Sequence, residues 1–329
     1  MKKTNIVLLA LALMSQYSMA VCEVDRVTPE KGTEPTTLEV PAQVIRVDAD
    51  APVGTMIATY ESNPSTLVSF INCVPDVSRY GKSVNGLADA SQADRTFLTN
   101  IDGVVIKPRW SNTAAIGQFP STAIVKEQRF NYPAGSKFIT EYYKTKPRLS
   151  LKNPESPGDI VLPGGFIAYN WIEINDPSNY GQKLNIGQVT IISTPVCRID
   201  GEKTVDFNTV SSSDIERGVT RPLDFSLTCA TDYGDYTASA SLTTQTPSAD
   251  SKFIQVTDNA GNADRLKIRI DSSTGTHLLL DGSNGESKSS TDDIAAQFNW
   301  RATLLRDSAT DLPASGQFNA TAEIVLLVN

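Results

Sequence analysis

The last stretch of the chain alternates apolar and polar residues in the manner of a β-strand with one buried face. From position 318 the even positions are all apolar: Phe318, Ala320, Ala322, Ile324, Leu326 and Val328. The odd positions begin polar and turn apolar at Val325 and Leu327, so the second half is expected to need cover on both faces. No turn or partner strand follows it. We therefore expect another chain to cover this strand.

The same period of two recurs along the chain and predicts strands at regular intervals. The candidates are residues 44–47, 56–59, 104–106, 166–174, 188–192, 205–207, 223–229, 236–242, 266–270 and 298–304. Clusters of turn-forming residues lie at 258–262, 272–275 and 281–285. Convincing long amphipathic helices are missing. The pattern predicts an all-β protein made of β-sandwiches.

The beginning of the chain has the features of a secretory signal peptide. Lys2 and Lys3 form a basic start, residues 6–14 are apolar, and small residues precede a cleavage site after Ala20. The apolar run is too short to span a membrane. A lipoprotein signal is the alternative because Cys22 lies close by, but Val21 before it fits lipid attachment poorly. Residues 1–20 are therefore predicted to be removed on export.

The net charge of the exported chain is negative, which disfavours two classes of binding partner. Removing Lys2 and Lys3 takes the formal charge from -8 to -10, which argues against nucleic acid and anionic lipid surfaces as main partners.

Four cysteines remain in an exported chain, an even count that suggests disulfides. Three pairings are possible. The local one, Cys22–Cys73 with Cys197–Cys229, places one bridge in each domain and is the pairing we predict.

The length left after export suggests two domains. A strand-like run over residues 188–192 is followed by Pro195, which interrupts pairing, and then by Cys197. The boundary is therefore predicted between residues 193 and 194. Residues 21–193 form the first domain and residues 194–329 the second.

Catalytic chemistry finds little support in the sequence. His277 is the only histidine and lies in a turn, so neither a Ser-His-Asp site nor a zinc site is expected. Nucleophile elbows, HExxH and phosphate-binding loops are missing. The acidic pairs Asp48/Asp50 and Asp292/Asp293 could act as glycosidase carboxylates or calcium ligands. We instead expect them to be solvent-exposed acids on loops. We expect a non-enzymatic protein without metal or cofactor.

Three segments of the second domain resemble the pilin domain of the chaperone–usher family. They are residues 197–200, 203–210 and 221–229, which combine the cysteine spacing with the opening motif. Gly316, fourteenth from the end, and the alternating strand after it match the end of a pilin. The family has an aromatic penultimate residue where this chain has Val328. The resemblance covers residues 197–329.

The first domain resembles, more loosely, the receptor-binding domain of two-domain fimbrial tip adhesins, the group that includes the mannose-binding type 1 adhesin. The likeness rests on Cys22, residues 47–57, Cys73, and the later residues 147–152 and 164–168. The resemblance implies two immunoglobulin-like β-sandwich domains. The second is expected to be a pilin fold that lacks its last strand.

The resemblance also implies partners and a location. A periplasmic chaperone, an outer-membrane usher and an adjacent pilin that donates a strand are expected to engage the second domain. The groove is expected to involve Gly316 and the alternating set Phe318, Ala320, Ala322, Ile324, Leu326 and Val328. Only one residue precedes Cys22 after export, so we expect no donor arm. Such a subunit accepts a strand without giving one and belongs at the tip of a surface fimbria.

The first domain is expected to bind a host glycan or matrix protein. By likeness to the mannose-binding relative, the candidate receptor residues are Val21, Asp76 and, on a late loop, Asn175, Asp176, Asn179 and Tyr180. Plain turn chemistry is the alternative for these positions. Tyr132, Tyr142 and Tyr143 are either a flat binding surface or strand residues. A structural tip or minor pilin without receptor binding, or a secreted carbohydrate-active enzyme, are the alternative functions.

Overall fold

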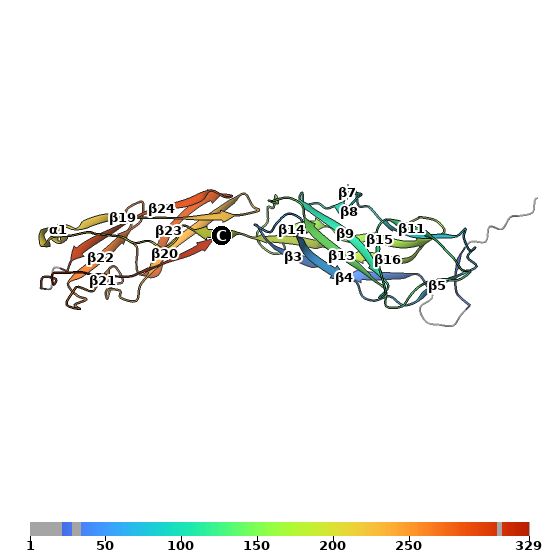
Figure 1. Ribbon diagram of the computed structural model, residues 1–329, viewed down its shortest axis with the longest axis horizontal. Helices are drawn as coiled ribbons and strands as arrows, with labels where there is room; N and C mark the ends of the chain where they lie inside the picture. The colour runs from blue at the N-terminus through green and yellow to red at the C-terminus, as the bar shows by residue number, and fades with distance from the viewer. Residues whose placement is uncertain (1–21, 28–33, 308–310, 329) are drawn as a thin grey trace, which may run out of the picture.

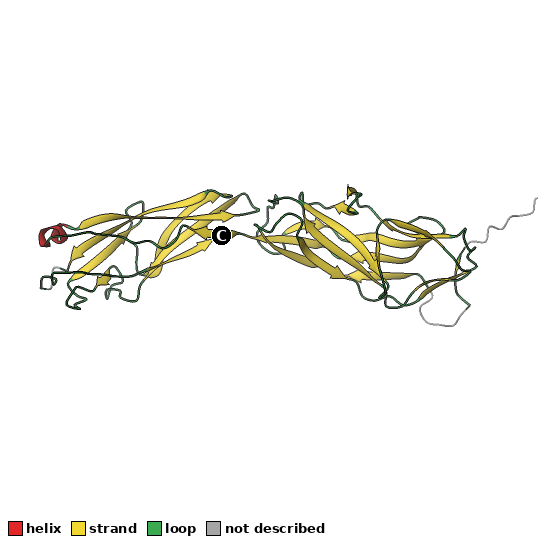
Figure 2. Ribbon diagram, viewed as in Figure 1, coloured by secondary structure: helices red, strands yellow, loops and turns green. Residues whose placement is uncertain are grey.

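The structure, a computed structural model, describes residues 22–27, 34–307 and 311–328. These residues form two elongated lobes of β-strands arranged end to end (Figure 1). Strands dominate both lobes, and the described helix is a short one at the far end of the second lobe (Figure 2). The predicted all-β fold class is confirmed. The predicted signal peptide and Val21 lie outside the described residues.

The first lobe contains the first seventeen strands. They are β1 (Glu23–Val24), β2 (Thr36–Val40), β3 (Gln43–Asp48), β4 (Met56–Glu61), β5 (Val68–Ile71), β6 (Arg79–Val84), β7 (Asp89–Ser91), β8 (Thr96–Leu98), β9 (Val104–Ser111), β10 (Ile116–Gln118), β11 (Ser121–Ile124), β12 (Phe130–Tyr132), β13 (Lys137–Lys144), β14 (Asp159–Leu162), β15 (Gly165–Ile172), β16 (Tyr180–Ile186) and β17 (Val189–Thr194).

Two larger sheets enclose the core of this lobe. One has the order β11-β6-β15-β16-β2, and the other has the order β4-β13-β9-β8-β7 with β10 paired to β9. Trp110 of β9 donates its indole N–H to Gln182 of β16 across the core at 2.7 Å. Tyr132 and Tyr142 are buried in this core, which agrees with a strand role. Small sheets, β1-β5-β12 and β14-β17-β3, complete the lobe.

The second lobe is a separate sandwich with its own core. Its elements are β18 (Val196–Ile199), α1 (Ser212–Arg217), β19 (Val219–Ala230), β20 (Asp235–Thr243), β21 (Ile254–Val256), β22 (Leu266–Asp271), β23 (Asp281–Thr291), β24 (Ala295–Arg306) and β25 (Glu323–Val328). The sheets have the orders β18-β19-β24-β22-β21 and β23-β20-β25. Between them the rings of Phe225 and Phe298 stack 4.9 Å apart beside the fully buried Trp300.

Three predictions of local structure in this lobe were wrong. Residues 205–207 form no strand, and the terminal strand begins at Glu323 rather than at 318. Between positions 318 and 322, which the structure describes, the backbone pairs only at Asn319, which bridges to Thr257 next to β21, so no continuous ladder forms there. Conversely, the predicted turn at 281–285 opens β23, because β20 pairs with it at Thr243↔Asp281 and Ser241↔Gly285. A hydrophilic Ser- and Gly-rich segment can thus be a strand when a partner supplies the ladder.

Each lobe contains one disulfide, and both match the predicted pairing. Cys22 is bonded to Cys73, and Cys197 is bonded to Cys229. The second bridge joins directly opposite residues of β18 and β19. The two hydrophobic cores likewise consist of separate sets of residues. Two domains are therefore evident, while the boundary between 193 and 194 stays a prediction.

A buried carboxylate joins the two lobes. Asp232, between β19 and β20, accepts the backbone N–H of Leu149 at 2.7 Å and the hydroxyl of Ser193 at 2.6 Å. The Tyr233 hydroxyl accepts the N–H of Ser193 at 2.9 Å. Leu149 and Ser193 belong to the first lobe, and Asp232 and Tyr233 to the second. Hydrogen bonds from two segments of one lobe to one loop of the other favour a single relative orientation.

An arginine on the first lobe adds a charged clamp to the same junction. The Arg148 Nε lies 2.9 Å from Asp292, and its Nη2 lies 2.8 Å from Asp293. Its Nη1 also donates to the carbonyl of Ala49 at 3.2 Å. Asp292 in turn accepts the N–H of Thr231, next to Asp232, at 2.8 Å. The clamp therefore fixes the loop that carries the buried carboxylate.

We expect Asp232→Ala to loosen the junction without unfolding either lobe. The substitution leaves the Leu149 N–H and the Ser193 hydroxyl without their acceptor, and each unsatisfied buried group costs roughly 1–3 kcal/mol. Small-angle X-ray scattering of the full chain should show a broader range of shapes, and proteases should cleave faster near residue 195. Asp235→Ala, an exposed position a few residues away, is the control. Equal scattering and cleavage for both variants would contradict a locking role for Asp232.

Candidate functional site: an open groove in the second lobe

The terminal strand β25 is the edge of its sheet. It pairs antiparallel with β20 from Ala238↔Val328 to Thr243↔Glu323. On its other side, no strand pairs with it among the residues that the structure describes. The backbone N–H and C=O groups on that side of β25 therefore have no partner strand in the described part of the chain. Such an edge is a template for another strand.

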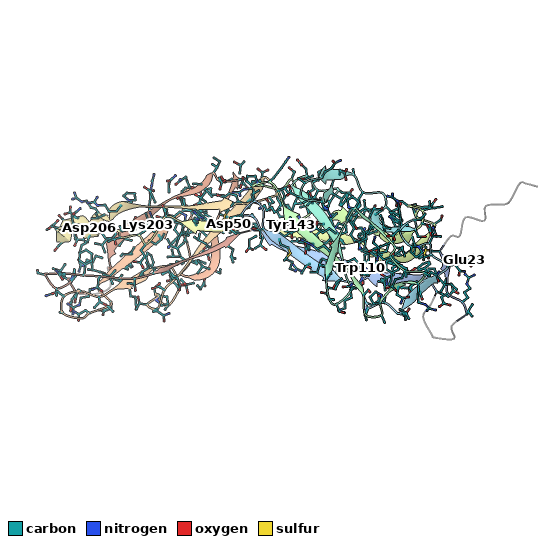
Figure 3. All side chains as sticks on the ribbon, turned by 45° about the vertical axis from the view of Figure 1, so that its right-hand side comes forward. Glu23, Asp50, Trp110, Tyr143, Lys203 and Asp206 are labelled. Carbon is teal, nitrogen blue, oxygen red and sulfur yellow. A yellow bond between two sulfur atoms is a disulfide. The ribbon has the colours of Figure 1, made fainter. Side chains whose placement is uncertain are left out.

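The facing wall of the groove belongs to the opposite sheet. The edge strand of that sheet, β18, ends at Ile199, and the chain continues through residues 200–207 without regular structure. Figure 3 labels Lys203 and Asp206 on this segment, with Asp206 nearer the far end of the lobe. Ile199 is 62% exposed although it is apolar. The two sheets of the sandwich are thus left open along one side.

Between these two walls lies a groove of about 800 Å³. Its floor is made of apolar side chains from the core strands: Leu223, Phe225, Leu242, Ile254, Ile268, Ile270 and Ala302. Residues 199–205 with Phe207 form one wall, and residues 318–324 with Leu326 form the other. A long apolar floor beside the open edge of β25 is shaped for an extended chain with alternate apolar side chains.

The structure places the predicted groove residues along one wall. Phe318, Ala320, Ile324, Leu326 and Val328 all pack against the core of the lobe. Ala322 also lines the groove. Their role in receiving a donated strand stays a prediction.

The apolar odd positions of β25 lie on its other face. Leu327 is 64% exposed there, beside the half-buried Val325. The sequence predicted that both faces of this strand are covered. In the structure, the core of the lobe covers the inner face, and the outer face stays exposed at Leu327.

Gly316 precedes this wall and has to be a glycine. Its φ is +128°, and a Cβ atom at this position would lie 2.5 Å from the side chain of Asn259. A residue with a side chain would therefore push the wall away from the 258–262 turn.

The same turn holds the wall through a buried carboxylate. Asp258 accepts the backbone N–H groups of Ala314 at 2.9 Å, Asn262 at 3.0 Å and Ala260 at 2.9 Å. The N–H of Ala314 and the side-chain amide of Asn262 together lower the pKa of Asp258 far below its usual value. The ionised carboxylate thus links the turn to the segment that leads into β25.

We expect Asp258→Asn to lower the Tm of the full chain at neutral pH. Because the folded state depresses the pKa, the stability that Asp258 contributes is complete above its unfolded pKa of about 3.9 and is lost as the pH falls below it. The variant should therefore lose less stability than the parent between about pH 5 and pH 2. Asp264→Asn, an exposed position, is the control. An unchanged pH slope would contradict the assigned role of Asp258.

A second candidate site lies in the first lobe, at the end remote from the second (Figure 3, near Glu23). Glu173, which sequence reasoning did not identify, ties three segments together there. One of its carboxylate oxygens accepts the N–H of Cys22 at 2.9 Å and the hydroxyl of Ser78 at 2.6 Å. Its own N–H donates to the carbonyl of Arg79 at 2.7 Å. The start of the described chain, the loop after Cys73 and the loop after β15 therefore meet at Glu173.

The predicted receptor residues of these loops mostly stabilise the loops themselves. The Asn175 side chain accepts the Tyr169 hydroxyl at 2.8 Å, and the Asn179 side-chain amide donates to the carbonyl of Ile172 at 2.9 Å. Asp176 accepts the hydroxyl and the N–H of Ser178, which lower its pKa. These contacts agree with the turn-chemistry alternative.

Asp76 is exposed, like Asn175, Asp176 and Asn179. Its carboxylate is 71% exposed and lies 2.6 Å from the Lys126 Nζ. Its φ of +61° is unusual for a residue other than glycine. Val21 lies outside the described residues.

A strip of rings and one ammonium group extends this surface along β15 and β16. The Lys183 Nζ lies 4.6 Å from the ring centre of Tyr180 and 5.6 Å from that of Phe166. The rings of Phe166 and Tyr169 are 5.6 Å apart. Tyr180 was predicted at this site, but Phe166 and Lys183 were not. Their spacing along the two strands becomes informative only once the pairing of β15 with β16 is known.

Residues considered for catalysis have structural contacts. The His277 Nε2 lies 2.6 Å from the carbonyl oxygen of Lys252. Asp292 and Asp293 are held by Arg148 at the junction of the lobes. In the part of the chain that the structure describes, no cluster of His, Cys, Asp or Glu side chains could hold a metal ion. The same part contains no helix with the length and hydropathy needed to span a membrane.

Residues 187–329 match the model of a family described as fimbrial protein. The match covers the whole second lobe and β17 of the first. The second lobe is therefore similar to fimbrial proteins, in agreement with the resemblance found for residues 197–329. No curated protein matches the chain.

Among solved structures, the receptor-binding domain of the plasmid-borne adhesin MrkD1P of Klebsiella pneumoniae is 19% identical, with a TM-score of 0.39, over 49% of this chain and 92% of that one. A chaperone–tip subunit complex of Csu pili from Acinetobacter baumannii is 14% identical, with a TM-score of 0.39, over 88% and 98%. CfaE, the adhesive subunit of CFA/I fimbria of enterotoxigenic Escherichia coli, is 11% identical, with a TM-score of 0.35, over 90% and 93%. These structural similarities are too weak to support a function. Among the comparisons, only the family match does so.

Proposed function

We propose that this protein is the adhesive tip subunit of a surface fimbria and has no enzymatic activity. Its second lobe joins the fibre by accepting a strand from an adjacent pilin, after a periplasmic chaperone has covered the groove and an outer-membrane usher has exchanged the two. Its first lobe binds a receptor on the host surface. The observation that supports this proposal most is the open groove beside β25, within a domain that matches the fimbrial protein family.

An added strand would supply the hydrogen-bond partner that the edge of β25 lacks and would cover the floor of the groove. A chain inserted between β25 and residues 199–207 would hydrogen-bond to the free edge of β25 and close the sandwich. Its alternate side chains would cover Leu223, Phe225 and Ile270 on the groove floor. Main-chain hydrogen bonds supply affinity, and the alternating side chains fix the register.

The receptor half of the proposal rests on the remote end of the first lobe. Exposed loops there carry Asp76 and residues 174–179, next to the strip of Phe166, Tyr180 and Lys183. Aromatic faces pack on the apolar face of a sugar ring, and carboxylates and amides bind its hydroxyl groups. A glycan or a matrix protein with a polar surface would fit such a site.

A structural tip or minor pilin without receptor binding is the second candidate. The internal hydrogen bonds of Asn175, Asp176 and Asn179 favour it, because those groups are already used within the loop. A secreted carbohydrate-active enzyme has no comparable support, since Asp292 and Asp293 are paired with Arg148.

Leu326→Asp should abolish incorporation into the fibre. The variant puts a carboxylate where the side chain packs toward the core, and burying it unpaired under an added strand costs several kcal/mol. We expect little protein in the periplasm, no copurification with the chaperone and none in fimbriae. Leu327→Asp is a matched control, because the neighbouring side chain is 64% exposed on the opposite face. If the Leu326→Asp protein reaches the fibre as well as the Leu327→Asp protein does, the strand-acceptor function is wrong.

A screen of the full chain against a glycan array and immobilised matrix proteins tests the receptor function. We expect a binder whose affinity falls in Asp76→Ala, while folding stays normal because exposed substitutions usually change stability by about half a kcal/mol or less. Asp264→Ala, an exposed position in the second lobe, should bind like the parent. No binder in the screen would favour the structural pilin. If Asp76→Ala binds as tightly as the parent, Asp76 does not take part in receptor binding.

A further inference from the structure

We propose that the groove selects its partner by charge: the donated strand that fits it has alternate apolar residues facing inward and lysine or arginine among the residues facing outward. This inference rests on the proposed function, because it assumes that the groove receives a strand. It adds the chemistry of the partner, which neither the fold nor the family match specifies.

The walls of the groove are acidic. Its lining includes three carboxylates, Asp200, Glu202 and Glu323, and a single ammonium group, Lys203. The Lys203 Nζ lies 2.9 Å from the Asp200 carboxylate, so these two charges neutralise each other. Glu202 and Glu323 are exposed, and neither has a cationic partner among the described residues. Two uncompensated negative charges therefore remain, one on each wall.

The two glutamates lie on opposite walls of the groove. Phe207 on one wall and Phe318 on the other are neighbours, with ring centres 6.5 Å apart. Glu202 belongs to the first of these walls and Glu323 to the second, and both line the same groove. A strand inserted along the groove therefore passes one free carboxylate on each side.

An inserted strand carries its outward side chains past these carboxylates. Successive side chains point to opposite faces, so those that do not enter the apolar floor project outward between the walls. A lysine or arginine among them meets an opposite charge on the walls. A glutamate or aspartate among them adds a negative charge to a groove that is already acidic. Opposite charges also steer the encounter and suppress wrong partners.

Matched synthetic peptides test this selection on the full chain. The peptides share the same alternating inward residues, and their outward residues are lysine, glutamate or threonine. Binding is measured by the rise in Tm and by Kd at about 0.05 M and about 0.5 M salt. We expect the lysine peptide to bind roughly tenfold more tightly than the glutamate peptide at low salt, with threonine between them, and the ratio to shrink at high salt.

Variants of the walls separate the charge effect from general binding. The double variant Glu202→Gln with Glu323→Gln should bind the lysine and glutamate peptides with nearly equal affinity. Glu155→Gln, an exposed position in the first lobe, should keep the parent's preference.

The outcomes distinguish this inference from the function on which it rests. Equal binding of the three peptides by the parent, or a preference for glutamate, would overturn charge selection while leaving strand acceptance intact. A preference for lysine that survives in the double variant would overturn the assignment to Glu202 and Glu323. If none of the peptides binds, strand acceptance fails as well.

Discussion

The structure of the second lobe depends on one row of backbone groups, those on the outer edge of β25. Backbone N–H and C=O groups that are buried without partners cost free energy, and here the edge borders an apolar groove rather than a polar surface. The sandwich cannot close itself, because residues 200–207 of the facing wall make no ladder with β25. An added strand solves both problems at once: it pairs with the edge and covers the floor. The proposed assembly therefore depends on this incomplete sheet.

The junction between the lobes connects this groove to the loops at the other end. Asp232 and Tyr233 hold the first lobe by hydrogen bonds, and Arg148 adds two ion pairs. Glu173 similarly joins the loops at the remote end to the start of the described chain. In both places one buried or half-buried carboxylate collects donors from segments far apart in sequence. This arrangement favours a rigid rod, which would present a receptor site at a fixed distance from the fibre.

Much of the fold could be predicted from the sequence, because alternation marks strands with one buried face. The strands around residues 223–229, 236–242 and 298–304 were found in this way, and both disulfides follow from local pairing. Strand β23 was missed because its residues are nearly all hydrophilic and only its ladder with β20 defines it. The site was harder to predict. Glu173 lies two residues before Asn175, but its contacts with Cys22 and Ser78 exist only in the folded chain. Phe166 reaches Lys183 through the pairing of β15 with β16, and Asn175 and Asn179 turned out to hold their own loop.

Amide hydrogen exchange of the full chain, with and without a donor peptide, tests the central claim most directly. Exchange reports local opening segment by segment, so it separates the edge strand from the rest of its sheet. Without the peptide, residues 323–328 should exchange much faster than their partner β20. With the peptide, residues 323–328 and 199–207 should become protected together, while the first lobe stays unchanged. If β25 is already as protected as β20 and the peptide changes nothing, the sheet is complete without a donated strand and the account is wrong.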